Sequence, residues 1–162
     1  GIDYHDPDKH PIPDFKTYFE IFAQHLHLRE GQSVHFELGR SIVAQCGTLI
    51  ARVLYVKQAA TKQFVIIDAG MTELIRPALY QAHHKVQNLT SQSTDYQVYD
   101  VVGPICESSD VFDKEVLLPP TKREDIIAIR SAGAYGETMA STYNCRPLPV
   151  SYTSEDFPLP LT

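Results

Sequence analysis

Residues 42–57, with the sequence IVAQCGTLIARVLYVK, form a long run rich in branched and aromatic side chains. Such side chains favour extended backbone, so we predict a β-strand within this run. Its second half alternates the side chains of Leu49, Ala51, Val53 and Tyr55 with those of Thr48, Ile50, Arg52 and Leu54. Because both sets are mostly apolar, the pattern predicts a strand that is buried on much of both faces.

Further strands are predicted after this run. Phe64–Ile67 is a second strand that ends at the turn Asp68-Ala69-Gly70, and we expect it to pair with the first strand as a hairpin. Other segments with strand composition are residues 97–102, 115–118, 126–130 and 137–144. Residues 71–84 can form helical turns that Pro77 interrupts, and residues 88–95 are typical of a polar loop. Together these segments predict a mainly β domain.

The start of the chain has a different character. Residues 1–13 form a proline-rich loop that begins without Met, and this beginning looks like a cut end. Asp14 then caps a predicted amphipathic helix that runs to Leu28, and residues 33–38 have the composition of a short strand. The helix has an apolar stripe formed by Phe15, Tyr18, Phe19, Phe22 and Leu26. One helix cannot bury such a stripe by itself, so we expect it to pack on a sheet or barrel.

Composition limits the classes of function. The chain has 162 residues, of which 43% are hydrophobic, and this suffices for one globular core. Its formal net charge is -6 and its Lys and Arg residues are not clustered, so we expect no nucleic-acid partner. It has neither an apolar run long enough to span a bilayer nor a signal-like start, so we expect a cytoplasmic protein with no membrane partner.

The cysteines and histidines form no metal-binding pattern. The three cysteines are Cys46, Cys106 and Cys145. They lack C-x-x-C spacing and therefore predict neither a disulfide framework nor a zinc site. His25 and His27 would point to different sides of a helix, and His83 and His84 are adjacent. We therefore predict that these histidines are solvated and that no metal is bound.

Residues 103–110, Gly-Pro-Ile-Cys-Glu-Ser-Ser-Asp, place a thiol, two carboxylates and two hydroxyls in one loop. A lone cysteine could be a small core residue. However, Cys106 is followed at once by Glu107 and then by three more polar residues, which favour exposed, hydrogen-bonding backbone. This loop is therefore a candidate site of chemistry, with packing of Cys106 as the alternative.

Three other segments combine glycine, arginine or tyrosine. Glu37-Leu38-Gly39-Arg40 could cradle a phosphate with its N–H groups and guanidinium, or be a β-turn with a solvated arginine. Arg76 and Tyr80 are four residues apart, so on a helix both could reach one carboxylate. Alternatively, Arg76 lies at the surface and Tyr80 at the edge of the core. In Gly133-Ala134-Tyr135-Gly136 an aromatic ring lies between glycines, which suits either a ring beside a ligand or a turn.

Together these segments resemble one family much more specifically than any segment alone. Residues 36–44, 68–71, 76–80, 103–110 and 133–136 follow the order found in the diaminopimelate decarboxylases. That family belongs to the fold-type III, alanine-racemase-like decarboxylases, which depend on pyridoxal 5′-phosphate. The resemblance covers residues 36–147 and implies the C-terminal portion of such an enzyme.

The resemblance also implies a fold. Residues 41–162 would be the family's C-terminal Greek-key β-barrel or sandwich domain. Residues 1–40 would be the remnant of its cofactor-binding (β/α)₈ barrel, namely the last helix and strand. Gly1-Ile2-Asp3-Tyr4 is similar to the end of the family's glycine-rich phosphate loop. This origin would explain an aromatic stripe that has nothing to cover.

Each candidate residue acquires a role from the resemblance. The cofactor-binding positions are Glu37, Gly39, Arg40 and Tyr135. The substrate-binding positions are Arg40, Arg76, Tyr80, Glu107 and Tyr135. Cys106 matches the residue that returns a proton to the carbanion left by carbon dioxide, and Glu107 matches the one that binds the distal amino group. Leu38 stands where the family usually has Pro, so the turn is expected to be less rigid.

The resemblance further implies a homodimer, because the family's loop equivalent to residues 103–110 enters the active site of the other subunit. No lysine in the chain has the sequence context of the family's Schiff-base lysine. We therefore expect that the intact enzyme converts meso-2,6-diaminopimelate to L-lysine, the last step of lysine biosynthesis. We expect this chain on its own to be inactive.

Two alternatives stay open. The protein could be a fold-type III decarboxylase that acts on arginine, ornithine or carboxynorspermidine, or a non-catalytic β module for interaction or dimerisation. The acidic charge and the aromatic face of the first helix permit the second alternative. The pair Cys106 and Glu107 favours diaminopimelate, because a carboxylate would bind the distant ammonium group of that substrate.

Overall fold

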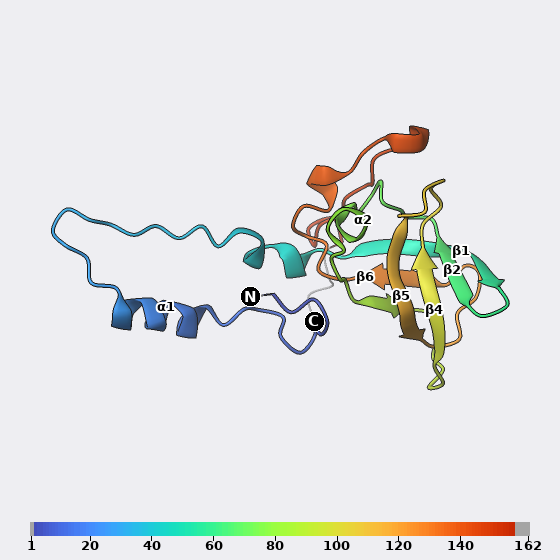
Figure 1. The fold of residues 1–162 in the computed structure, drawn as a ribbon, viewed down its shortest axis with the longest axis horizontal. Coiled ribbons are helices and arrows are strands. Elements are labelled where there is room, and N and C mark those ends of the chain that lie inside the picture. The colour runs from blue at the N-terminus through green and yellow to red at the C-terminus, as the bar shows by residue number, and fades with distance from the viewer. Residues whose placement is uncertain (1, 158–162) are drawn as a thin grey trace.

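A single curved sheet forms the body of the molecule. The computed structural model describes residues 2–157. The strands are β1 (Leu49–Gln58), β2 (Gln63–Ile67), β3 (Val86–Asn88), β4 (Gln97–Val102), β5 (Val111–Leu118) and β6 (Ile126–Ile129). They form a six-stranded sheet in the order β3-β6-β1-β2-β4-β5. Since β3 and β5 at the two ends of this order also touch, the sheet is a nearly closed barrel (Figure 1). The predicted mainly β fold is confirmed.

All neighbouring strands are antiparallel except β2 and β4, which are parallel. The predicted hairpin is β1 with β2, where Lys57 lies opposite Phe64. The interior of the barrel is lined by apolar side chains from every strand. They include Ala51, Val53, Val65, Ile67, Val86, Tyr99, Val101, Phe112, Leu118, Ile127 and Ile129. Burial of this layer is the main force that holds the domain together.

The prediction that β1 is buried on both faces is wrong. Ala51 and Val53 are buried, but Arg52 between them is exposed. Beyond Val53 the register with β2 shifts, and Tyr55 is 60% exposed. The pairing of β1 with β6 ends at Arg52, so the outer half of the β1–β2 hairpin extends past the barrel and has no layer to cover it.

Two segments predicted as strand are instead short 3₁₀ helices. Residues 44–46, in the run predicted to be rich in strand, form η2 (Ala44–Cys46), and residues 137–144 form η3 (Glu137–Met139) and the start of η4 (Tyr143–Cys145). The glycine turn expected at residues 37–40 leads into a further 3₁₀ helix, η1 (Gly39–Ser41). Neither segment predicted as strand is paired with a strand of the sheet. A strand needs such a partner for its backbone groups, and composition does not reveal whether one exists.

The other predicted strands occur near their expected places. Residues 97–102 are β4 and residues 126–129 are β6. The strand expected at residues 115–118 begins earlier, at Val111, and β3 precedes the predicted polar loop. The helical turns expected over residues 71–84 are the short helix α2 (Arg76–Tyr80). Pro77 lies in its first turn, where a missing N–H costs nothing, so this proline begins the helix rather than interrupting it.

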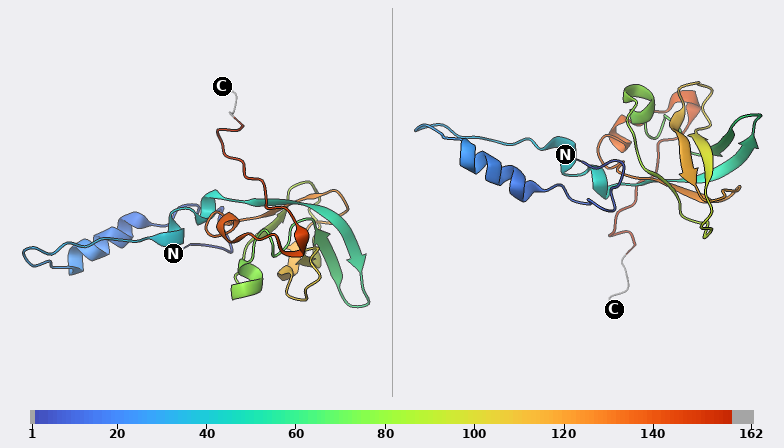
Figure 2. Two further views of the ribbon diagram at one scale, coloured as in Figure 1. Left: turned by 90° about the horizontal axis from the view of Figure 1, so that it is seen from above. Right: turned by 60° about the horizontal axis from the view of Figure 1, so that its bottom comes forward.

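The N-terminal part is an arm that projects from the barrel (Figures 1 and 2). The predicted helix is α1 (Phe15–His25), capped as expected by Asp14, whose carboxylate accepts the Thr17 N–H at 3.0 Å. No residue of α1 is buried. Its aromatic rings contact Phe36 on the returning segment, which has no strand pairing, so the strand predicted at residues 33–38 is not present. No helix within residues 2–157 is long and apolar enough to cross a membrane.

Candidate functional site

A hollow lies where the N-terminal segment meets the β domain. Its volume is about 810 Å³, and its walls include Tyr4, His5, Arg40, Arg76 and His83. Two of the predicted substrate-binding residues therefore share one cavity. The guanidinium carbons of Arg40 and Arg76 lie 5.9 Å and 5.2 Å from the centroid of the Tyr4 ring. The aromatic face of Tyr4 thus holds two positive groups close together.

The two arginines are in different environments. Arg40 follows Gly39 in η1 and is exposed, whereas Arg76 is only 4% exposed. One nitrogen of Arg76, Nη1, donates to the Tyr4 hydroxyl and to His84 Nε2, each at 3.1 Å. Tyr80 is 61% exposed at the far end of α2. The alternative that places Arg76 at the surface and Tyr80 at the edge of the core is therefore wrong.

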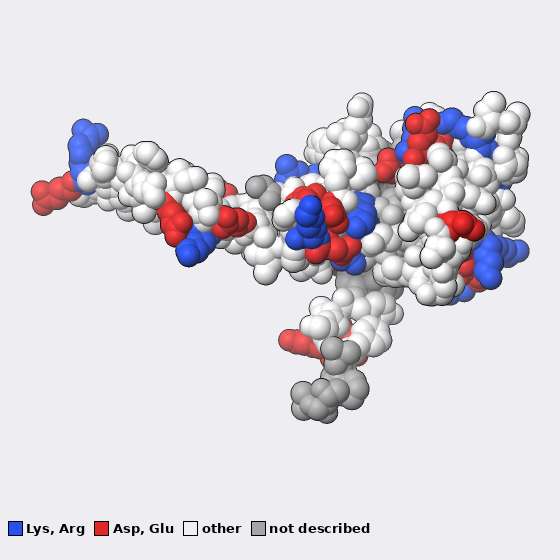
Figure 3. Space-filling view, turned by 90° about the horizontal axis from the view of Figure 1, so that it is seen from below, with Lys and Arg blue, Asp and Glu red and all other residues white. Residues whose placement is uncertain are grey.

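Ion pairs hold the N-terminal segment against the barrel. The Asp8 carboxylate accepts from Lys85 at 3.0 Å and from Arg130 at 2.9 Å, and Lys85 also pairs with Asp6 at 3.3 Å. The hydrogen bond from Lys85 lowers the pKa of Asp8 below its usual value. Figure 3 shows basic and acidic side chains gathered where the arm joins the β domain. These pairs keep Tyr4 in place beside Arg76.

The turn that carries Cys106 is built around a buried carboxylate. Asp110 is 4% exposed, and its carboxylate accepts the N–H groups of Ile105 at 2.8 Å and Met71 at 2.6 Å. Burial raises the pKa of Asp110, although both of these hydrogen bonds oppose the shift. A Cβ on Gly103 would lie 2.2 Å from the Asp110 carboxylate, so only glycine fits there. The turn is therefore rigid, and it holds Cys106 exposed to solvent.

Glu107 lies beside a segment that sequence reasoning assigned to a strand. Its carboxylate accepts a hydrogen bond from the Tyr143 hydroxyl of η4, which raises the pKa of Tyr143. Arg146, just after η4, donates to Glu73 at 3.2 Å and to the carbonyl of Asp68. The segment that leads into α2, the Cys106 turn and the η4 region thus form one connected end of the molecule (Figure 1).

The remaining predicted residues lie on glycine-dependent turns. Gly39 has φ +56°, and the space where its Cβ would be is open. Glu37, two residues earlier, is exposed. Tyr135 has φ +64° and is 50% exposed. Gly133 packs so tightly on η2 that a Cβ would lie 2.1 Å from the Val43 carbonyl oxygen.

The structure brings four of the predicted residues into two groups, whereas Glu37, Gly39, Tyr80 and Tyr135 belong to neither. Arg40 and Arg76 meet around Tyr4, while Cys106 and Glu107 lie on the turn beside Tyr143. The sequence predicts no site role for Tyr4, His84 or Tyr143, and it indicates Asp110 only as one of the carboxylates of the candidate loop. The prediction that His84 is solvated is wrong, because it is 1% exposed and its ring binds Arg76 and the Arg130 carbonyl. Its only signal in the sequence was its position shortly after the Arg76 segment.

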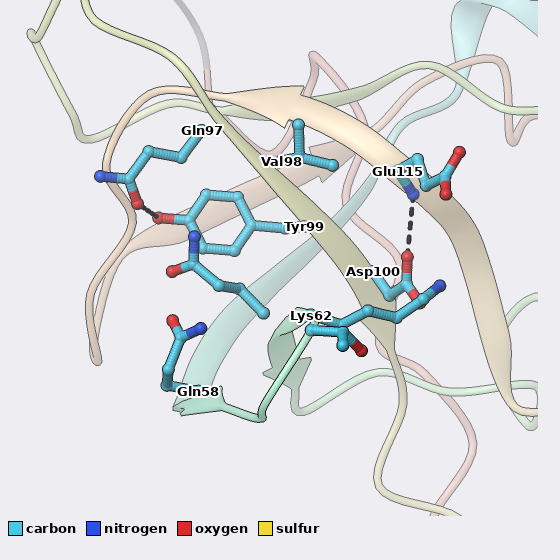
Figure 4. A pocket seen from close by; sticks show the side chains of 9 residues that line it. Gln58, Lys62, Gln97, Val98, Tyr99, Asp100 and Glu115 are labelled. Atoms are coloured by element: carbon cyan, nitrogen blue, oxygen red, sulfur yellow. Dashed lines mark hydrogen bonds and ion pairs between the residues drawn. The ribbon is translucent and has the colours of Figure 1, made fainter.

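A second hollow, of about 350 Å³, contains none of the predicted residues (Figure 4). Its walls include Gln58, Lys62, Gln97, Tyr99 and Asp100. Lys62 pairs with Asp100 at 2.8 Å, and the Tyr99 hydroxyl donates to Gln97 at 2.8 Å. These polar groups bind one another, so the contacts are accounted for by packing of the hairpin on β4.

Comparison with known families identifies the class. The sequence profile described as "Pyridoxal-dependent decarboxylase, C-terminal sheet domain" matches residues 10–133. The chain therefore belongs to the pyridoxal-dependent decarboxylases and contains their C-terminal sheet domain. Among individual proteins, the diaminopimelate decarboxylase of Bacteroides thetaiotaomicron is 62% identical over 156 residues, which are 96% of this chain and 40% of that protein. The predicted resemblance is confirmed.

Solved structures agree with this classification. Diaminopimelate decarboxylase from Helicobacter pylori, complexed with L-lysine, is 46% identical with a TM-score of 0.67. The match covers 81% of this chain and 31% of that one. Lysine/ornithine decarboxylase from Vibrio vulnificus, complexed with putrescine, is 26% identical with a TM-score of 0.66, over 76% of this chain and 33% of that one. This chain thus spans well under half the length of the relatives it matches.

Proposed function

We propose that this chain is the C-terminal part of a decarboxylase that converts meso-2,6-diaminopimelate to L-lysine with pyridoxal 5′-phosphate. The observation that supports this most is the 62% identity to a diaminopimelate decarboxylase over 96% of the chain, which includes the Cys106 turn. The turn has the rigidity that a catalytic group requires, because the Asp110 carboxylate binds the Ile105 N–H within the turn and also attaches the turn to the Met71 N–H.

The residues present fit a phosphorylated cofactor. Open space at Gly39 would let a phosphate approach the backbone, and the exposed Arg40 guanidinium can neutralise its charge. Glu37 and Tyr135 would complete this group from exposed positions. When bound, pyridoxal 5′-phosphate supplies a ring that withdraws electrons from the carbon that loses carbon dioxide. The protein's own task is then placement, charge complementarity and a proton.

Charge complementarity supports a substrate with two charged ends. Arg40 and Arg76 put two guanidinium groups on one hollow, which suits a carboxylate. Tyr80, at the exposed end of α2, would add a hydroxyl. Glu107 offers a carboxylate for an ammonium group at the other end of the substrate. A simple diamine would leave the arginines without an anionic partner, and this distinguishes diaminopimelate from such ligands.

Cys106 is the proton donor in this proposal. Its thiol is exposed at the tip of the Asp110-braced turn, and a thiol is a group that can donate a proton in general acid catalysis. The thiol would protonate the carbon from which carbon dioxide has left. Because the turn faces outward from its own domain, we place it in the active site of a second subunit of a cytoplasmic homodimer.

The domain division follows from the same proposal. Residues 1–40 would belong to the cofactor-binding barrel, and residues 41–162 to the C-terminal domain. The apolar face of α1, which no described residue buries, would pack against the rest of that barrel. The chain on its own would then lack most of the cofactor site and have no activity.

Complementation tests the proposal and its alternative. Mixed with pyridoxal 5′-phosphate and meso-2,6-diaminopimelate, the chain alone should form no lysine, and addition of the upstream barrel half should restore lysine formation. Lysine formed by the chain alone would show that the fragment is active, contrary to the proposal. If the barrel half forms no more lysine with the chain than without it, the chain is instead an independent interaction module.

Substrate choice is tested at Glu107. In the intact enzyme, Glu107→Ala should lower kcat/KM for diaminopimelate by about a hundredfold or more, as expected when a charged partner is left unpaired. Ser108→Ala, at the next exposed position, should leave it within about twofold. An unchanged preference for diaminopimelate in Glu107→Ala would favour an arginine, ornithine or carboxynorspermidine decarboxylase instead.

A further inference from the structure

Arg76 is an unusual buried cation. It is 4% exposed, yet no carboxylate of the described residues lies within ion-pair distance of its guanidinium. Burial of an uncompensated charge is costly, and neutral partners must hold such a group in place. Those partners are the Tyr4 hydroxyl and His84 Nε2, both at 3.1 Å from Nη1, with the Tyr4 ring also beneath the guanidinium.

The contacts of His84 define which ring nitrogen has the proton. Nε2 faces a guanidinium, which can only donate, so Nε2 must accept. Nδ1 lies 2.9 Å from the Arg130 carbonyl oxygen, which can only accept, so Nδ1 must donate. Both bonds form together only in the neutral imidazole with its proton on Nδ1. Desolvation and the nearby charge of Arg76 lower the pKa of His84 to about 4, which keeps this form neutral.

His84 is itself rigidly attached to the sheet. Just after it, the Lys85 carbonyl accepts the Arg130 N–H at 2.9 Å and continues the pairing of β3 with β6. The edge of the His84 ring meets the Tyr4 ring at a centroid distance of 5.2 Å and an angle of 76°. His84 therefore fixes the side chain of Arg76 relative to the sheet, although the left-handed turn at Gln81 separates His84 from α2.

We propose that His84 is a positioning residue for Arg76: its unprotonated Nε2 fixes the guanidinium so that the remaining donors face the hollow and meet a substrate carboxylate. This inference rests on the proposed function, because it assigns His84 a role in binding the substrate of that reaction. His84 does not touch the substrate. His84 affects substrate binding only by holding the guanidinium of Arg76.

Two substitutions separate the two hydrogen bonds of the ring. His84→Gln places an amide near the position of Nε2 and can still accept from Arg76. His84→Asn places its amide near Nδ1 and can donate only to the Arg130 carbonyl. In the intact enzyme, His84→Asn should raise KM for diaminopimelate about tenfold or more with little change in kcat. His84→Gln should raise KM much less, because it keeps an acceptor for Arg76. Equal KM values in the two variants would overturn the proposal.

A double-mutant cycle tests whether His84 acts through Arg76. If it does, His84→Asn should not raise KM further in an Arg76→Ala background. If the fold-changes in KM of the two substitutions multiply in the double variant, His84 acts by another route and the proposal is wrong.

A measurement that needs no activity separates this inference from the proposed function. In the ¹⁵N-labelled chain, His84 should show a protonated Nδ1 and an unprotonated Nε2 at neutral pH. The Arg76 Nη protons should exchange slowly with solvent in the wild type and in His84→Gln, and rapidly in His84→Asn. A proton on Nε2, or slow exchange in His84→Asn, would overturn the positioning role. If the intact protein released no carbon dioxide from diaminopimelate, the proposed function would fail, while these spectra would still decide the role of His84.

Discussion

The carboxylate of Asp110 accepts the backbone N–H of Ile105 at 2.8 Å and so closes the turn that presents Cys106. Its other oxygen accepts the Met71 N–H, which fixes the turn to the segment leading into α2. One buried side chain thus connects the proposed proton donor with the helix of Arg76. The backbone of this turn, rather than contacts of the thiol itself, sets the position of the exposed Cys106 side chain.

Asp110→Asn should destabilise the domain by about 1 to 2 kcal/mol, because an amide keeps only one acceptor for two backbone N–H groups. Urea unfolding followed by circular dichroism measures this loss. Ser108→Ala, on the same turn but exposed, should change the free energy of unfolding by less than about 0.5 kcal/mol. Equal values for the two variants would show that Asp110 does not brace the turn.

Gly133→Ala should destabilise the domain by about 3 kcal/mol, because its Cβ would lie 2.1 Å from the Val43 carbonyl oxygen and 2.8 Å from the Gly47 nitrogen. Backbone atoms cannot yield as a flexible side chain would. The comparison is Gly31→Ala, where φ is +80° but the space is open, and only about 1 kcal/mol of backbone strain is expected. Thermal unfolding of both variants checks the difference, and a smaller effect at Gly133 would contradict the packing described.

His84 should make stability depend on pH. Its folded-state pKa of about 4 lies below the ordinary value of 6.5, so the unfolded chain binds the proton more readily. The stabilisation is therefore complete above pH 6.5 and is lost as pH falls through 4, by at most about 3 kcal/mol. The nearby charges of Arg76 and His83 both oppose protonation of His84.

The non-titrating variant His84→Gln isolates this contribution. Urea unfolding between pH 6.5 and pH 4 should show a steeper loss of stability for the wild type than for the variant. Other groups, such as Asp8 and Asp110, titrate in both proteins and cancel in the difference. Parallel curves would mean that His84 is not held neutral by burial.

Leu38→Pro should stabilise the chain by about 0.4 to 1 kcal/mol. Leu38 has φ −71°, within the range that proline imposes, so the substitution restricts mainly the unfolded chain. The family resemblance points to the same residue type at this position. Chemical denaturation measures the gain. A loss of stability would show that the turn before Arg40 needs the Leu38 side chain or its N–H.

The features that the sequence predicts correctly are those that a local pattern of residues determines. The hydrophobic strands β2, β4 and β6, the Asp14 cap of α1 and the polar Cys106 turn were all visible as short motifs. The failures share a cause, which is dependence on partners distant in sequence. Residues 137–144 have strand composition but pair with no strand, and the outer half of β1 extends beyond the layer that would bury it.

The same limit applies to the site. Arg40, Arg76, Cys106 and Glu107 were identified because they lie in recognisable motifs. The sequence predicts a solvated His84, since no periodicity shows that a histidine faces a guanidinium eight residues earlier. Tyr4 is even harder to predict, because the ion pairs of Asp8 with the barrel bring it to Arg76 across 72 residues.

The central claim is tested most directly by the products of the intact enzyme. Supplied with pyridoxal 5′-phosphate, it should release carbon dioxide from meso-2,6-diaminopimelate and form L-lysine, and should act far more slowly on ornithine and arginine. Carbon dioxide from ornithine or arginine, without lysine from diaminopimelate, would contradict the account.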